Sequence, residues 1–234
     1  MRINMTNPTG LPGAVLFDMD GTLTDTEKLW FEAETEVLAD LGRSWKAGDE
    51  MAVIGLNLLD ASRYLTTSLD LELEPAELAR RLTDRVVAIG RQKGMPWRPG
   101  ALELLELVAH LGIPSALVTA SHMPFAQLAL EQAPAGTLSV VVTGDQVENG
   151  KPHPQPYLEA ISRLGIPAYR AVAFEDSIHG VTSAVAAGAV VVGVPLKVDI
   201  SGVANITLVD SLSDVDEYFL SAVMTTIEAP PAIS

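Results

Sequence analysis

The sequence predicts an α/β fold in which a parallel sheet is covered by helices on both faces. Short apolar runs of strand length alternate with helical patterns through most of the second half of the chain. Runs that are apolar at every position are typical of strands buried on both sides, as they are in parallel sheets. Ligands of such sheets bind at the carboxyl ends of the strands, so the residues that follow each strand are the first candidates for chemistry.

The predicted strands are short and rich in Val, Ala and Leu. They cover Ala14–Phe17, Ile113–Val118, Ser139–Thr143, Ala171–Phe174, Ala189–Gly193 and Ile206–Val209. A helix over 101–111 precedes the second strand and ends at Gly112, which is a common residue after a helix. Helical segments separate the strands that follow, as the crossovers of a parallel sheet require.

Between the first and second strands the periodicity is only helical. Thr24 and Glu27 have the spacing of a capping box, and apolar positions recur at helical intervals after them up to Gly42. Two more helical patterns follow at 58–69 and 75–91, with no strand among them. This part of the chain is therefore predicted to be all-helical.

The length of the chain suits one core that carries a smaller insert. The chain has 234 residues, 48% of them apolar, which is enough for two compact units. The Pro- and Gly-rich stretch 93–100 returns the chain from the helices to the sheet. We expect a core formed by 1–25 and 96–234 and an inserted all-helical domain at 26–95.

Composition limits the classes of partner and of chemistry. The 15 basic and 30 acidic residues give a formal net charge of −15, which disfavours a nucleic-acid partner. The absence of cysteine excludes disulfides, thiolate catalysis and cysteine-based zinc sites. No signal peptide and no apolar run of spanning length is visible, so we expect a cytoplasmic protein with no membrane partner.

The most informative residues follow the first strand. Asp18 and Asp20 stand two positions apart at its carboxyl end, before Gly21 and Thr22. The two carboxylates of such a pair can take different roles in one phosphoryl transfer. One can bind a metal and attack phosphorus, while the other donates and accepts protons. The glycine turns the chain, and Thr22 offers its hydroxyl and amide to phosphate oxygens. Asp-Gly between apolar runs is also a strong hairpin signal, which is the alternative for this motif.

Polar side chains also follow the later strands at the same predicted edge of the sheet. They are Thr119, Ala120 and Ser121 after the second strand, Lys151 in the loop after the third, and Glu175 and Asp176 after the fourth. Because the carboxyl ends of parallel strands lie along one edge, we expect these residues to converge.

The converging residues can bind a metal and activate a nucleophile. Asp18, one of Glu175 and Asp176, and the backbone carbonyl of Asp20 would give Mg²⁺ oxygen ligands while leaving room for a phosphate oxygen. Lys151 would offset charge at the phosphorus and keep Asp18 ionised. Asp20 would protonate the leaving alkoxide and then deprotonate the water that hydrolyses the aspartyl phosphate.

The residues after the second strand would complete the site. Thr119, with the amides of Ala120 and Ser121, would hold a phosphoryl oxygen. Each residue also has a structural interpretation, since Thr119 or Ser121 could cap the next helix and Lys151 could be a solvated turn residue. Their joint occurrence in this order, each at a strand end, favours the catalytic interpretation.

Taken together, the motifs are similar to those of a known family. Asp18-x-Asp20-Gly-Thr22, Thr119, Lys151-Pro and Glu175-Asp176-Ser177 resemble the motifs of the haloacid dehalogenase superfamily. The helical insert resembles the cap of the branch that contains β-phosphoglucomutase and phosphoglycolate phosphatase. The resemblance implies a Rossmann-like core, a mobile helical cap, Mg²⁺ dependence and an aspartyl-phosphate intermediate on Asp18.

The second acid of the first motif indicates the reaction. In this superfamily dehalogenases lack an acid two positions after the nucleophile, because a halide leaves without a proton. Asp20 therefore implies phosphoryl transfer. We expect a Mg²⁺-dependent phosphatase of a small phosphorylated metabolite, a sugar or organic-acid phosphate, with a sugar phosphomutase of the β-phosphoglucomutase type as the alternative.

The insert favours the phosphatase over the mutase. A mutase must hold a second phosphate in its cap, and the resemblance places Trp30, Leu58 and Leu82 where mutases carry histidine, arginine and lysine. Other cationic residues of the insert could still supply that charge from another turn. They are Arg63, Arg81 and Arg85.

The insert is also expected to contribute residues that contact the substrate. Trp30, Gly55, Leu56 and Asn57 are expected to face the substrate, although Trp30 also fits the apolar face of its helix. We expect a monomer or a weak dimer. A signalling receiver is disfavoured because its phosphoacceptor lies later in the chain, and a catalytically inactive binding protein is disfavoured because all motif residues are present.

Overall fold

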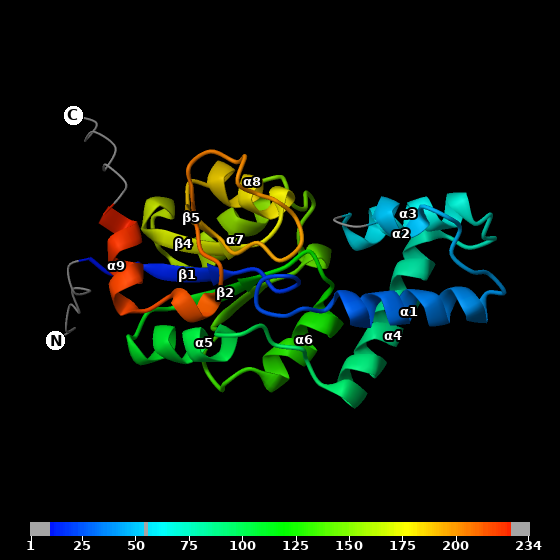
Figure 1. Ribbon diagram of the computed structural model, residues 1–234, viewed down its shortest axis with the longest axis horizontal. Coiled ribbons are helices and arrows are strands. Elements are labelled where there is room, and N and C mark those ends of the chain that lie inside the picture. The colour runs from blue at the N-terminus through cyan, green and yellow to red at the C-terminus, as the bar shows by residue number, and fades with distance from the viewer. Residues whose placement is uncertain (1–9, 54–55, 226–234) are drawn as a thin grey trace.

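A parallel sheet with helices on both faces forms the core of the protein (Figure 1). The computed structural model describes residues 10–53 and 56–225. The sheet order is β3-β2-β1-β4-β5-β6, with every neighbouring pair parallel. The strands are β1 (Ala14–Phe17), β2 (Ser115–Val118), β3 (Val140–Val142), β4 (Ala171–Glu175), β5 (Val190–Gly193) and β6 (Ile206–Leu208). This topology confirms the predicted α/β fold class.

Each predicted strand is present, with small differences at the ends. β2 begins at Ser115 rather than at Ile113, since Pro114 has no N–H to donate to a neighbouring strand. β1 lies between β2 and β4 and is parallel to both. The Asp-Gly turn after β1 therefore does not form a hairpin, and that alternative is wrong.

The predicted helices are present, together with two that the sequence does not predict, a short helix in the insert and a helix after the last strand. They are α1 (Glu27–Asp40), α2 (Asp49–Val53), α3 (Leu58–Ser68), α4 (Pro75–Lys93), α5 (Ala101–His110), α6 (Met123–Gln132), α7 (Gln155–Leu164), α8 (Ile178–Ala186) and α9 (Glu217–Thr225). The short helix is α2, which has too few residues to show a helical repeat. None of the described helices combines the length and apolar character needed to cross a bilayer.

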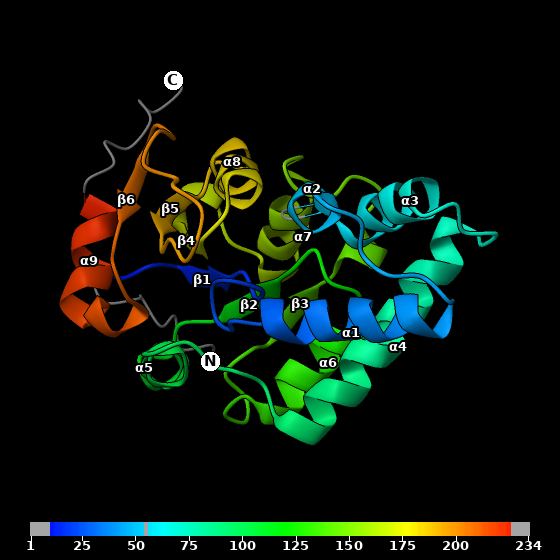
Figure 2. The same cartoon turned by 45° about the vertical axis from the view of Figure 1, so that its right-hand side comes forward.

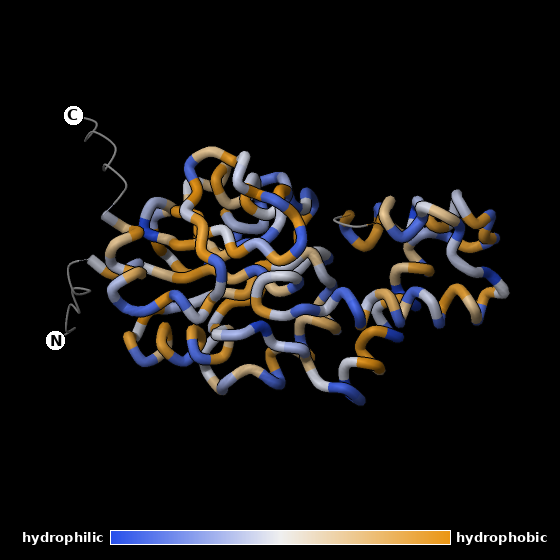
Figure 3. Tube along the Cα trace, viewed as in Figure 1, coloured by the Kyte–Doolittle hydropathy of each residue, from blue (hydrophilic) through white to orange (hydrophobic). Residues whose placement is uncertain are grey.

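The two faces of the sheet are covered by different helices (Figures 1 and 2). α5, α6 and α9 pack on one face around Phe17 and Phe174, whose rings stack with centroids 5.5 Å apart. α7 and α8 cover the other face, which includes Leu16. Figure 3 shows apolar residues concentrated along the strands. Burial on both faces explains why the strands are apolar at every position.

The first helix starts later than the capping box predicts. α1 begins at Glu27 with Thr26 as its N-cap residue. The hydroxyl of Thr24 instead donates to the carbonyl of Met19 at 3.0 Å, and the N–H of Gly21 donates to the carbonyl of Thr24 at 2.7 Å. The capping-box prediction is wrong because Thr24 closes the loop that carries Asp20.

Helices α1 to α4 form a group beside the sheet (Figure 1). At the far end of this group they enclose a small apolar cluster of their own, consisting of Val37, Leu38, Leu65, Leu69, Leu78 and Leu82. Nearer the sheet, α1 and α4 instead contribute Leu29, Ala33, Val86 and Ile89 to the main core. The helices are therefore packed against α6 as well as against each other.

The chain crosses between the helical group and the core through two segments that are paired. The N–H of Asp25 donates to the carbonyl of Pro96, and the N–H of Arg98 donates to the carbonyl of Leu23, both at 2.8 Å. The first crossing leaves the loop that carries the acid pair. The position of the helices is thus linked to that loop by backbone hydrogen bonds.

We predict that Leu82→Ala lowers the free energy of unfolding by about 2–5 kcal/mol, because it leaves a cavity in the cluster shared by α1, α3 and α4. Chemical denaturation measures the change. Leu158→Ala is the matched control, since that side chain is 45% exposed and its truncation is expected to cost about 0.5 kcal/mol or less. Equal losses in the two variants would contradict the prediction.

Candidate active site

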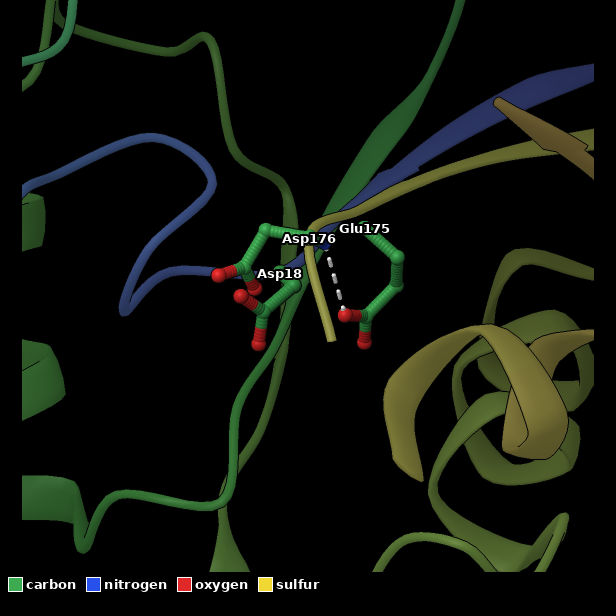
Figure 4. A group of neighbouring side chains, drawn as sticks. All are labelled: Asp18, Glu175 and Asp176. Carbon is green, nitrogen blue, oxygen red and sulfur yellow. Dashed lines mark hydrogen bonds between the residues drawn. The ribbon is translucent and has the colours of Figure 1, made fainter. Parts of the chain in front are cut away.

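The ends of β1 and β4 bring three carboxylates together (Figure 4). One oxygen each from Asp18, Glu175 and Asp176 lies within 4.8 Å of the others. Asp18 and Glu175 are buried, and Asp176 is partly buried. In Figure 4 the carboxylates of Asp18 and Asp176 face each other, while that of Glu175 lies to one side. Residues separated by more than 150 positions thus meet because their strands are hydrogen-bonded neighbours.

Lys151 supplies the positive charge of this cluster. Its Nζ donates to Asp18 Oδ1 at 2.6 Å, to Glu175 Oε1 at 2.5 Å and to the carbonyl of Val118 at 2.9 Å. The side chain is only 7% exposed, so the interpretation of Lys151 as a solvated turn residue is wrong. Burial favours the neutral amine, but the charges of Asp18 and Glu175 outweigh it and raise the pKa of Lys151.

Tyr157 on α7 is a member of the site that the sequence does not reveal. Its hydroxyl donates to Glu175 Oε1 at 2.6 Å, and the Nζ of Lys151 lies 5.2 Å from the centre of its ring. Burial and the negative charge of Glu175 raise the pKa of the phenol. The only signal available in the sequence is a large aromatic residue six positions after Lys151, which is also typical of a core position.

Glu175 is held by the protein on both of its carboxylate oxygens. Oε1 accepts from Lys151 and Tyr157, and Oε2 accepts from the N–H of Asp176 at 3.3 Å and the hydroxyl of Ser177 at 3.4 Å. The carboxylate also lies against Gly180, where a Cβ would come within 1.9 Å of Oε2. The neighbouring protein therefore fixes the orientation of Glu175.

Asp18 has a free oxygen in the same cluster. Its Oδ2 is buried and has no hydrogen-bond partner among the described residues, although its Oδ1 accepts from Lys151. A buried anionic oxygen without a donor is costly unless a cation binds it. Burial and the nearby charges of Asp18 and Glu175 also raise the pKa of Asp176 to about 8. This set of hard oxygen donors with an uncompensated negative charge fits a divalent cation.

Asp20 occupies a different environment from Asp18. Hydroxyl groups of Thr26, Thr119 and Ser121 and the indole N–H of Trp30 all donate to its carboxylate, with distances of 3.2 Å for Thr119, 2.7 Å for Ser121 and 3.3 Å for Trp30. Burial raises the pKa of Asp20, and these hydrogen bonds oppose the shift only in part. A carboxyl group with a raised pKa is suited to donate a proton near neutral pH.

The structural interpretation of Thr119 and Ser121 as helix caps is wrong. α6 begins at Met123 with His122 as its N-cap residue. The hydroxyl of Thr119 instead accepts from the N–H of Ser121 at 3.0 Å, and both hydroxyls donate to Asp20. Ala120 lies between them, partly buried at the end of β2.

Thr22 contacts the acid cluster from the loop after β1. Its hydroxyl donates to Asp176 Oδ1 at 3.4 Å. Gly21 precedes it with φ of +91°, and a Cβ at that position would lie 2.1 Å from Asp176 Oδ2. Only glycine allows the loop to approach Asp176 this closely.

The residues of the insert that are expected to face the substrate differ in their burial and in their contacts. Trp30 is partly buried, with its ring packed edge-on against Phe125 at 5.2 Å and its N–H directed to Asp20. Asn57 caps α3 and bonds to Asp60 through both its amide and its carbonyl oxygen. Leu56 is 41% exposed, and Gly55 lies outside the described residues. Substrate contacts by these residues stay a prediction.

The acid cluster with its buried lysine lies at the carboxyl edge of a parallel sheet, which is where α/β proteins of this kind bind their ligands. Residues 15–194 match the family model described as haloacid dehalogenase-like hydrolase, and the chain belongs to that family. The resemblance predicted from the motifs is confirmed.

Similar proteins include named phosphatases. The phosphorylated carbohydrates phosphatase of Thermotoga maritima is 33% identical over 180 residues, which cover 75% of this chain and 81% of that protein. Hexitol phosphatase B of Escherichia coli K12 is 29% identical, with 74% of this chain and 79% of that protein covered. The structure of CbbY from Rhodobacter sphaeroides in complex with phosphate has a TM-score of 0.79 at 28% identity and covers 87% of this chain and 96% of that chain.

We predict that divalent-cation binding weakens as the pH falls. Because the pKa of Asp176 is raised to about 8, a proton must leave before the carboxylate can ligate, so below that pH protons compete with the cation. Calorimetric titrations between about pH 9 and about pH 6 should show an apparent dissociation constant that rises by about tenfold or more. An affinity that does not change over this range would contradict the assignment of Asp176.

We predict that Tyr157→Phe lowers the free energy of unfolding by about 1–3 kcal/mol, because it removes a buried hydrogen bond to a carboxylate and keeps the shape of the side chain. Denaturant unfolding measures the loss. The control is Tyr169→Phe at a side chain that is 49% exposed, where a change within about 0.5 kcal/mol is expected. The same small change in both variants would show that the hydroxyl does not hold Glu175.

Proposed function

We propose that this protein is a Mg²⁺-dependent phosphatase that hydrolyses a small phosphorylated metabolite through an aspartyl phosphate on Asp18. The main support is the buried Oδ2 of Asp18, which has no hydrogen-bond partner among the described residues and belongs to a cluster of three carboxylates, two of which pair with Lys151. The named activities of the similar proteins support a phosphorylated sugar or polyol as substrate, with an organic-acid phosphate as the wider class.

The residues of the acid cluster would hold the cation. Asp18 and Asp176, with the backbone carbonyl of Asp20, are the proposed ligands, and Glu175 supplies a third carboxylate within reach. When bound, Mg²⁺ would supply charge neutralisation between the nucleophile and a phosphate oxygen. Mg²⁺ is the proposed ion because all the available donors are hard oxygens.

In the first step a carboxylate oxygen of Asp18 attacks phosphorus, and the bond from phosphorus to the ester oxygen breaks. Asp20 donates a proton to the departing oxygen, so that the product leaves as an alcohol. Lys151 donates to Oδ1 of Asp18 at 2.6 Å and orients the carboxylate. Thr119 and the amides of Ala120 and Ser121 would receive a phosphoryl oxygen as charge develops on it.

In the second step a water molecule attacks the phosphorus of the aspartyl phosphate. Asp20, now ionised, takes a proton from that water, and inorganic phosphate leaves while the carboxylate of Asp18 is restored. Thr26, Ser121 and Trp30 donate to Asp20 in the free protein and would orient it for both transfers.

The contacts of the insert support a phosphatase over a mutase. The arginines that could hold a second phosphate are engaged by carboxylates. Arg63 pairs with Asp60, Arg81 with Glu77, and Arg85 with Glu36 and Asp40. Leu82 is 1% exposed inside the cluster of the insert, so that position cannot present any side chain to a substrate. The argument from the insert therefore depends on Trp30 and Leu58.

We predict that Asp18→Asn and Asp20→Asn abolish turnover of alkyl phosphates. The assay is phosphate release from sugar, polyol, nucleotide and organic-acid phosphates with Mg²⁺, and hydrolysis should be fastest within the sugar and polyol group. Asp199→Asn, at an exposed loop residue, is the control that should retain activity. Wild-type turnover by the Asp18→Asn variant would reject the assignment of Asp18 as the nucleophile.

An activated ester separates the roles of the two aspartates. p-Nitrophenyl phosphate has a leaving group that needs no proton, so Asp20→Asn should release one equivalent of nitrophenol in a burst and accumulate phosphorylated protein. Asp18→Asn should give no burst. A burst in Asp18→Asn, or none in Asp20→Asn when the wild type turns over, would contradict the assigned roles. The cytoplasmic location, the monomeric or weakly dimeric state and the lack of a nucleic-acid partner stay predictions.

A further inference from the structure

Arg98 lies where the chain returns from the insert to the core, and the mechanism above gives it no role. Its side chain is partly buried. The guanidinium donates to three backbone carbonyls, those of Gly21, Val194 at 2.8 Å and Pro195 at 3.4 Å. In the part of the chain that the structure describes, no carboxylate lies within ion-pair distance of it. An arginine with only carbonyl partners orients them through its planar fork of donors.

The carbonyls bound by Arg98 belong to two loops, which follow the strands on either side of β4. Gly21 lies in the loop after β1 and touches the carboxylate of Asp176, with no room for a Cβ between them. Val194 directly follows β5, and its N–H donates to the carbonyl of Glu175 at 2.7 Å. One guanidinium therefore links the segment that touches the side chain of Asp176 to the segment that holds the backbone next to it.

The backbone of Arg98 also binds the loop after β1. Its N–H donates to the carbonyl of Leu23, two residues beyond Gly21 in the same loop. Both ends of the residue thus hold the loop after β1. The two loops leave different strands. The hydrogen bonds made by Arg98 therefore help to fix the distance between them at this edge of the sheet.

We propose that Arg98 is a positioning residue that keeps Asp176 directed at Asp18, and that its planar donor group is required for tight Mg²⁺ binding. The inference rests on the proposed function for the identity of the cation. Arg98 contacts neither substrate nor the reacting atoms. It acts through Gly21, whose position limits the directions open to the Asp176 carboxylate.

The test is Arg98→Lys, which keeps the positive charge and removes the planar fork. Calorimetric titration with Mg²⁺ should show a dissociation constant about tenfold higher than that of the wild type. At saturating Mg²⁺, kcat and the KM for a sugar phosphate should stay within about twofold, because no group that touches substrate has changed. Arg170→Lys is the matched control, since its guanidinium donates to the carbonyl of Leu11 at 2.6 Å on a segment just before β1.

Arg98→Met separates position from charge. The charge of Arg98 also lowers the pKa of Asp176, so these titrations are made above about pH 9, where that carboxylate is ionised. At that pH a positive charge near the cation site weakens binding, so if Arg98 acted through charge alone, Arg98→Met would bind Mg²⁺ more tightly and Arg98→Lys would match the wild type. That pair of results would overturn the proposal, and weaker binding by both variants would support it. Circular dichroism melts in EDTA check folding, and Arg98→Gln is measured in the same way if either variant does not fold.

The same titrations distinguish this proposal from the function on which it rests. If the wild-type protein binds no Mg²⁺, both the proposed cofactor and the role of Arg98 are rejected. If the wild type and Arg98→Lys bind Mg²⁺ equally well, only the role of Arg98 is rejected.

Discussion

The balance of charge at one edge of the sheet is the constraint on which the site depends. Asp18, Glu175 and Asp176 lie within one small volume, and Lys151 is the buried cation that pairs with two of them. Burial and the negative charge of Asp18 raise the pKa of Glu175 and of Asp176, so the cluster must either take up protons or bind a metal ion. Hydrogen bonds from neighbouring side chains to Glu175 and Asp176 help to hold these like charges close together.

The two aspartates of the first motif differ because their surroundings differ. Asp18 lies beside Lys151, whereas Asp20 is surrounded by hydroxyl groups and an indole N–H from α1 and the end of β2. Two carboxylates in unlike environments can take unlike roles, one as nucleophile and one as proton carrier. The loop after β1, which carries Asp20, is held in place by hydrogen bonds from Thr24 and Arg98.

The insert and the core form one continuous packing arrangement in this structure. α1 and α4 share the main apolar cluster with α6, and Trp30 contacts both Phe125 and Asp20. The predicted division at 26–95 follows the change from mixed to purely helical periodicity, yet the apolar contacts cross that division. Periodicity in the sequence reports the local structure of a segment. It does not report that α1 and α4 pack against α6, and for that reason the apolar contacts cross the predicted boundary.

The sequence by itself determined the fold class, the family and the kind of chemistry, because strand and helix periods and the four motifs are properties of short segments. Only the tertiary structure decided that Lys151 pairs with Asp18 across 133 positions, that Tyr157 donates to Glu175, and that Thr119 and Ser121 bind Asp20 and do not cap a helix. Those contacts depend on which strands are neighbours and on how side chains pack between them, and no single segment contains that information.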